Sequence, residues 1–184
     1  MIAQIKDLIK IQQQVNAKVK EKLTTELTNE QFILAFNIEL FEYFNAVGIW
    51  KWWKHSHKVD RERILDELAD CFAFFLSLVD NQNEYTKAES CEDIVEKIEK
   101  EINFYLDALA KHAFETDFTK EEILIDLITY VGTDNEAQGI FTTERFSIAI
   151  FIATILFEGI TWDEIIAAYK LKSDVNIQRQ ANNY

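Results

Sequence analysis

The fold is decided by TNEQFILAFNIELFEYFNAVG, residues 28–48, and by DRERILDELADCFAFFLSLVD, residues 60–80. In both stretches apolar residues recur every three or four positions, which is the spacing of an amphipathic helix. Thr28 followed by Gln31 has the form of a capping box, and Asp60 is suited to cap the second stretch. The sequence therefore predicts two long helices here, each with one apolar face to bury.

The remainder of the chain has the same helical pattern. Its 184 residues include no proline and only four glycines, which favours long helices joined by short polar turns. Further helices are predicted at residues 2–22, 90–112, 119–132, 143–159 and from 161 onward. We expect a single all-α domain, residues 1–184, whose four-helix core is formed by residues 28–48, 60–80, 90–112 and 143–159. The first and last helices and the weakly patterned segment 113–142 are expected to be peripheral.

Composition excludes several classes of protein. A net charge of −13 argues against a nucleic-acid-binding surface, which needs clustered lysine and arginine. The most apolar run, residues 146–157, is shorter than the roughly 20 residues that span a bilayer, so no membrane association is expected. The N-terminal MIAQIKDLIK lacks the apolar stretch of a signal peptide. Cys71 and Cys91 form no disulfide framework, and a cytoplasmic location is predicted.

Two acidic pairs stand out from the many in this chain. Carboxylates three residues apart are frequent here, and most of these pairs are expected on solvated helix faces. The pair Glu39 and Glu42 instead continues the apolar stripe of residues 28–48. Similarly, Glu67 lies within the apolar face of residues 60–80, and Asp70 lies at its margin. All four positions are candidates for metal ligands.

The chemistry of carboxylates explains why this placement matters. A carboxylate on an apolar face is costly to bury unless it is paired or binds a metal ion. Two facing helices with an acidic pair each can surround cations, and oxygen ligands without cysteine favour Mg²⁺, with Mn²⁺ as the second choice. Such cations would support phosphoryl chemistry by bridging phosphate oxygens and activating water. The alternative is a half-exposed groove in which lysine or arginine pairs with the carboxylates.

The spacing Glu39-x-x-Glu42 followed by Glu67-x-x-Asp70 resembles the ExxE…ExxD signature of the all-α nucleoside triphosphate pyrophosphohydrolases, which include dimeric dUTPases and MazG-type enzymes. Three other segments are similar to dimeric dUTPases, including those of phages. They are Gln13-x-x-Asn16, the WKxWK-like Trp50-Lys51-Trp52-Trp53-Lys54, and the C-terminal Lys172-x-x-x-Asn176-x-x-Arg179-Gln180-x-x-x-Tyr184. This sequence departs from the family pattern at Ser173, where asparagine is usual, and at Asn183, where glycine is usual.

The resemblance implies Mg²⁺-dependent hydrolysis of dUTP, and of dUDP, to dUMP by a homodimer. It implies that Glu39 is the base for the attacking water and that Gln13 and Asn16 bind uracil, because their amides offer the donors and acceptors that this base requires. It places Trp52 against the base and Lys54 on phosphate. It also places Lys172, Asn176, Arg179 and Tyr184 on the sugar and phosphates.

Two other functions fit the same residues. A change in base preference would give a dCTP-specific or broad-specificity pyrophosphohydrolase with the same metal site. A chain without activity would be an acidic helical partner of a repressor protein. In phage relatives the variable region that corresponds to residues 113–142 is associated with such a repressor, so this partner is a prediction of the resemblance.

Overall fold

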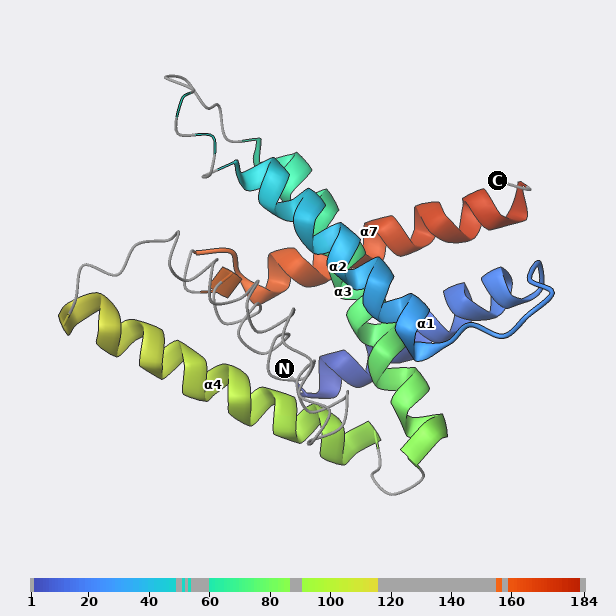
Figure 1. Ribbon diagram of the computed structural model, residues 1–184, viewed down its shortest axis with the longest axis horizontal. Coiled ribbons are helices and arrows are strands. Elements are labelled where there is room, and N and C mark those ends of the chain that lie inside the picture. Colours follow the sequence, from blue (N-terminus) through green and yellow to red (C-terminus); the bar gives the residue numbers. More distant parts are fainter. Residues whose placement is uncertain are drawn as a thin grey trace.

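The structure is a computed structural model, and it describes residues 2–48, 51, 53, 60–86, 91–115, 155–156 and 159–182. Every element in these ranges is a helix, which confirms the predicted all-α class (Figure 1). None of the described helices is long and apolar enough to cross a membrane.

The described helices match the predicted ones closely. They are α1 (Ile2–Lys20), α2 (Asn29–Val47), α3 (Arg61–Thr86), α4 (Cys91–Glu115) and α7 (Trp162–Ala181). Helix α3 continues six residues beyond the predicted end at Asp80, and α4 continues three residues beyond His112. The helix predicted at 119–132 lies outside the described residues, as does most of the helix predicted at 143–159.

Both ends of α2 are capped, and the cap at its start is the predicted one. Thr28 accepts a hydrogen bond from the Gln31 backbone, and the Gln31 side chain accepts one from the Thr28 backbone, so the capping box is complete. At the other end Gly48 adopts φ 67°, and its N–H donates to the Phe44 carbonyl at 2.9 Å. A left-handed residue at this position favours glycine, which has no Cβ to clash.

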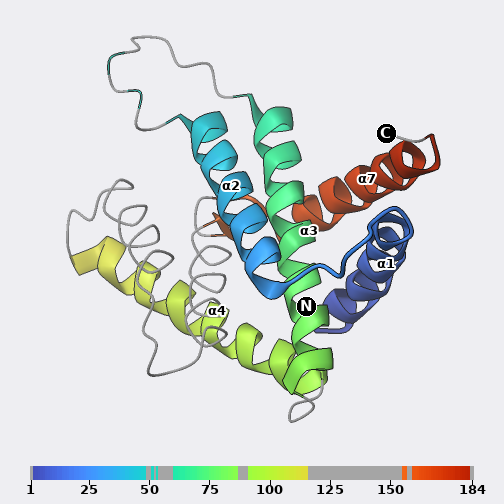
Figure 2. The same ribbon diagram turned by 45° about the vertical axis from the view of Figure 1, so that its right-hand side comes forward.

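Helix α3 lies at the centre of the described structure. Helix α2 packs antiparallel along one side of it, while α1 and α7 pack against the other side (Figures 1 and 2). Helix α4 crosses near the end of α3 and also contacts α1. The largest fully buried side chains come from all of these helices, and they include Ile5, Leu40, Phe75, Ile102 and Tyr169.

Helices α1 and α7 run parallel and contact each other along their whole length. The Trp162 indole N–H donates to Gln4 at 3.0 Å, the Tyr169 hydroxyl donates to Gln12 at 3.0 Å, and Lys22 donates to the Gln180 carbonyl at 2.5 Å. The sequence analysis placed neither helix in the four-helix core, yet both contribute buried residues to it. Their apolar faces are interrupted by the buried polar side chains Gln12 and Ser173, which weakens the sequence pattern.

The start of α7 is fixed by side-chain hydrogen bonds. Thr161 and Glu164 form a second complete capping box, and Arg61 of α3 donates to Glu164 at 2.7 Å. Bonds from the Thr161 backbone, from Arg61 and from the Thr161 hydroxyl lower the pKa of Glu164 to about 2. The position of α7 along α3 therefore depends on the hydrogen bonds of Thr161, Glu164 and Arg61.

Replacing Thr161 with alanine should lower the free energy of unfolding by about 1 kcal/mol, because the cap hydrogen bond is lost. Urea unfolding followed by circular dichroism measures this change. The control is Thr25→Ala in the exposed connection between α1 and α2, which should leave stability unchanged. Equal stability of both variants would show that the cap does not fix α7.

Candidate metal and nucleotide site

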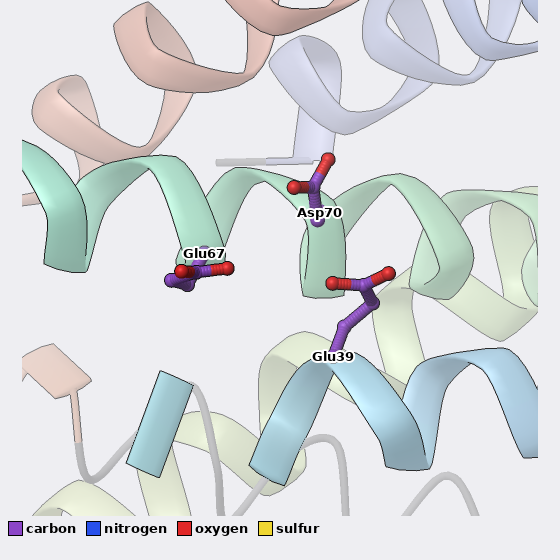
Figure 3. Close-up of side chains that lie close together, drawn as sticks. All are labelled: Glu39, Glu67 and Asp70. Carbon is purple, nitrogen blue, oxygen red and sulfur yellow. The ribbon is translucent and has the colours of Figure 1, made fainter. Parts of the chain in front are cut away.

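Three of the four predicted metal ligands converge. Oxygen atoms of Glu39, Glu67 and Asp70 all lie within 4.8 Å of one another. Figure 3 shows the Glu39 side chain extending from α2 toward α3, which carries the other two carboxylates. Two chain segments more than 20 residues apart thus form one acidic cluster, and the antiparallel packing of α2 on α3 places them together.

The helical repeat explains the position of each carboxylate. Glu67 and Asp70 are one turn apart on α3, beside the fully buried Leu68 and Cys71. Their side chains are 13% and 20% exposed, so both lie at the edge of the core. Glu39 is half-buried on α2, next to the buried Leu40. The apolar faces of the two helices therefore hold the carboxylates at their shared boundary.

Burial and, after it, electrostatic repulsion disfavour the negative charges of this cluster. Burial and the negative charges of Asp70, Glu42 and Glu67 raise the pKa of Glu39 from 4.5 to about 7. Burial, followed by the charge of Glu42, also raises the pKa of Glu67. Glu42 itself is exposed and does not belong to the group of three, but it lies close enough to act on both neighbours.

Lysine and arginine side chains of the described helices oppose this repulsion. The Lys172 ammonium, 16% exposed on α7, donates to Asp70 at 2.7 Å and to Asp66 at 2.8 Å. Partial burial disfavours its charge, but the two carboxylates outweigh this effect and raise the pKa of Lys172. Arg63 contacts Glu67 at 3.5 Å. The pKa of Asp70 is still raised, since its burial outweighs the charge of Lys172.

The cluster fits a hard divalent cation. Its donors are carboxylate oxygens from three side chains, and the one cysteine beside them, Cys71, is buried in the core. Oxygen ligands of this kind suit Mg²⁺ and Mn²⁺ better than softer metals. The alternative from the sequence, a groove paired with lysine or arginine, is also partly realised, because Lys172 and Arg63 contact the cluster.

Helix α7 presents the predicted phosphate-binding residues on one face. Lys172, Asn176 and Arg179 are spaced by four and three residues, so they follow one another along the helix. Arg179 lies close enough to Asp70 for its positive charge to lower the pKa of that carboxyl group. A single helix thus lines the acidic cluster with positive charge.

Helix α1 turns the predicted uracil-binding residues toward α3. Gln13 donates to Asp80 at 2.7 Å, and Asn16 donates to Ser77 at 3.1 Å. Gln13 is exposed and Asn16 is half-buried. Trp52, Lys54 and Tyr184 lie outside the described residues.

The sequence analysis did not single out several residues that contact this site. Arg63 is four residues before Glu67 and Asp66 four before Asp70, and the former spacing is a recognisable signal for an ion pair. Gln12 and Ser77 carried no such signal, because polar residues on helices are usually solvated. Only the packing of α1 and α7 on α3 buries them.

The raised pKa of Glu39 gives stability an unusual pH dependence. Between pH 4.5 and about 7 the folded chain holds a proton that the unfolded chain releases, so stability without metal falls as the pH rises through this range. Glu39→Gln removes the repulsion, and we expect its melting temperature in EDTA to exceed that of the wild type at pH 8 and to equal it near pH 5. Glu26→Gln, in the exposed α1–α2 connection, serves as the control. A lower melting temperature for Glu39→Gln at pH 8 would contradict the repulsive cluster.

Comparison with known families agrees with this geometry. The comparison with curated proteins gives no match. The profile of the family described as dUTPase, in contrast, matches residues 4–184 and therefore includes α1, α2, α3 and α7 together. The chain belongs to this dUTPase family and is a hydrolase that acts on dUTP.

Proposed function

We propose that this chain hydrolyses dUTP, and also dUDP, to dUMP with Mg²⁺ held by Glu39, Glu67 and Asp70. Glu42 is the proposed fourth ligand and would approach the cation from the exposed side. The observation that supports this most is the convergence of three carboxylates, from two helices, in a chain of the dUTPase family. Mn²⁺ has the same ligand preferences and is the proposed substitute.

In this proposal different residues have different roles in the hydrolysis. The bound cation would neutralise phosphate oxygens and lower the pKa of water. Glu39 is the proposed acceptor for the proton of the attacking water, as the resemblance implies, and burial with its acidic neighbours raises its pKa to about 7. A bound cation lowers this value, so it describes the chain before metal binding. Lys172 and Arg179 bind the phosphates, and the planar guanidinium of Arg179 suits two oxygens at once.

The remaining nucleotide contacts are assigned from the sequence resemblance. Gln13 and Asn16 bind uracil, Trp52 stacks on it, and Lys54 contacts phosphate. Asn176 and Tyr184 are assigned to the sugar and phosphates. We propose a cytoplasmic location, which suits the free thiol of Cys71. The phage-type relationship and a repressor partner stay predictions, and residues 116–142 of the segment concerned lie outside the described residues.

Replacing Glu67 with glutamine should reduce pyrophosphate release from dUTP by about 100-fold or more, because a metal ligand is lost. The assay follows pyrophosphate from dUTP, dCTP and dTTP, and phosphate from dUDP, with Mg²⁺, with Mn²⁺ and with EDTA. The control is Glu62→Gln, an exposed position in the first turn of the same helix. Undiminished turnover by Glu67→Gln would contradict the metal site. Faster turnover of dCTP than of dUTP would contradict the base assignment.

We also propose that a second copy of the chain covers one face of α2. Leu34, Ile38 and Phe41 follow one another along this helix and are 61%, 50% and 55% exposed. Exposed apolar side chains in a row are typical of an interface. The resemblance to dimeric dUTPases indicates that the occupant is another copy.

Ile38→Glu should convert the dimer to a monomer, since a charge would be buried against an apolar face. Light scattering after gel filtration measures the mass. Leu171→Glu, at an exposed leucine on α7, is the control and should leave the mass unchanged. A dimer that persists in Ile38→Glu would place the interface elsewhere.

A further inference from the structure

A chain of hydrogen bonds crosses the core between α7, α1 and α3. Tyr169 donates to the side-chain carbonyl of Gln12 at 3.0 Å, and the Gln12 amide donates to the Asn16 carbonyl at 2.9 Å. Asn16 donates to the Ser77 hydroxyl at 3.1 Å, and Ser77 donates to the Ala73 backbone carbonyl at 3.0 Å. Tyr169, Gln12 and Ser77 are 0%, 5% and 1% exposed, whereas Asn16 is half-buried and lies at the edge of this chain.

The chain has one direction when each hydroxyl donates to its nearer acceptor, which for Tyr169 is Gln12 at 3.0 Å and not the Leu8 backbone carbonyl at 3.3 Å. The single proton of the Ser77 hydroxyl has two acceptors within reach, the Ala73 backbone carbonyl at 3.0 Å and the Asn16 side-chain carbonyl at 3.3 Å. In the shorter of these bonds Ser77 donates to Ala73 and accepts from Asn16. The amide nitrogen of Asn16 therefore faces Ser77, and its carbonyl oxygen faces the Gln12 nitrogen. The carbonyl of Gln12 in turn faces the tyrosine hydroxyl. Among the described residues, the second N–H of Asn16 has no protein partner, so Asn16 offers a ligand a donor.

The neighbouring Gln13 is oriented in the opposite sense. Its amide nitrogen donates to the Asp80 carboxylate at 2.7 Å. An ionised carboxylate only accepts, so it selects the nitrogen of Gln13 and turns the carbonyl oxygen away. Within the described part of the chain that oxygen has no hydrogen-bond partner. Gln13 therefore offers a ligand an acceptor, one turn of α1 away from the donor of Asn16.

We propose that Asp80 and Gln12 are positioning residues that make the site select uracil over cytosine, by fixing Gln13 as an acceptor and Asn16 as a donor. This inference rests on the proposed function, in which Gln13 and Asn16 bind the base. Neither Asp80 nor Gln12 contacts the base. They act by determining which atoms of the two recognition amides face it.

The chemistry of the two bases explains the selection. Uracil has an N3–H donor flanked by carbonyl oxygens, which complements an acceptor beside a donor. Cytosine has an unprotonated N3 and, at position 4, an amino group that donates. Its N3 would face the Gln13 oxygen, and acceptor would meet acceptor. An amide that was free to rotate would accommodate both bases, so the discrimination depends on the two residues that prevent rotation.

The position of these amides suits a nucleotide bound at the acidic cluster. Ser77 lies seven residues, or two helical turns, beyond Asp70 on α3, which corresponds to about 10 Å along the helix axis. Asp70 and Ser77 therefore lie on nearly the same face of α3. Helix α7 contacts both parts of this proposed site: Lys172 bonds to Asp70 of the acidic cluster, and Tyr169 bonds to Gln12 beside the recognition amides.

Asp80→Asn tests the inference most directly. The new amide is able to donate to the Gln13 oxygen and so reverse the orientation of Gln13. We expect the ratio of kcat/KM for dUTP to that for dCTP to fall about tenfold or more, which corresponds to one hydrogen bond that is made or opposed. Gln12→Met, which removes the donor to Asn16, should lower the same ratio. Asp80→Glu keeps an acceptor and should preserve it.

Controls separate positioning from stability. Asp107→Asn on α4 and Gln14→Met on α1 are exposed positions outside this network, and both should keep the wild-type ratio. The Mg²⁺ concentration for half-maximal activity should be unchanged in Asp80→Asn, because the acidic cluster is intact. Asp80 is half-exposed, so this variant decides the matter even if Gln12→Met does not fold.

The outcomes distinguish this inference from the proposed function. A wild-type enzyme without a preference for dUTP over dCTP would overturn the base assignment to Gln13 and Asn16. A wild-type preference that Asp80→Asn retains within twofold would leave the proposed function in place and overturn the role of Asp80. A fall in kcat that is equal for both nucleotides would also overturn it.

Discussion

Three carboxylates that repel one another are held within 4.8 Å by the packing of α2 on α3, and the site depends on this constraint. Burial and, after it, the charges of its acidic neighbours raise the pKa of Glu39 to about 7. Stability must come from elsewhere, and the apolar faces of the same helices supply it through residues such as Leu40, Leu68 and Phe75. Hydrophobic burial thus holds together an arrangement whose repulsion Lys172 and Arg63 reduce in part, and which a bound metal ion would stabilise further.

Helix α7 connects the two halves of the site. Its Lys172 contacts Asp70 of the acidic cluster, and its Tyr169 begins the hydrogen-bond chain that includes Asn16 and Ser77. These two residues of α7 are less than one turn apart, so a displacement of the helix would move phosphate and base contacts together. The capping box at Thr161 and the bond from Arg61 to Glu164 hold the start of α7 against α3. The hydrogen bonds of Thr161, Arg61 and Glu164 therefore help to position both the phosphate contacts and the base contacts of α7.

The comparison of sequence and structure shows which kinds of signal are reliable. The capping box at the start of α2 was predicted correctly, because a threonine and a glutamine three residues later act within a single turn. The four-helix core omitted α1 and α7, since Gln12 and Ser173 interrupt their apolar faces. Of the four expected ligands, Glu39, Glu67 and Asp70 converge, whereas Glu42 is exposed. Periodicity in the sequence shows which face of a helix a residue lies on. Whether a residue at the margin of that face is buried or exposed depends on the helix that packs against it.

The sequence by itself determined the helical class, the limits of α2, the acidic pairs and the resemblance that the family comparison confirms. These features are local: they depend on hydrogen bonds within a turn and on residue spacing along one helix. The tertiary structure alone decided that Lys172 contacts Asp70, that Gln12 is buried, and that Asp80 orients Gln13. Each of these contacts joins helices that are distant in the sequence. Which atom of a side-chain amide donates and which accepts depends on the residue that packs against it from another helix. Residue spacing along one helix does not encode this.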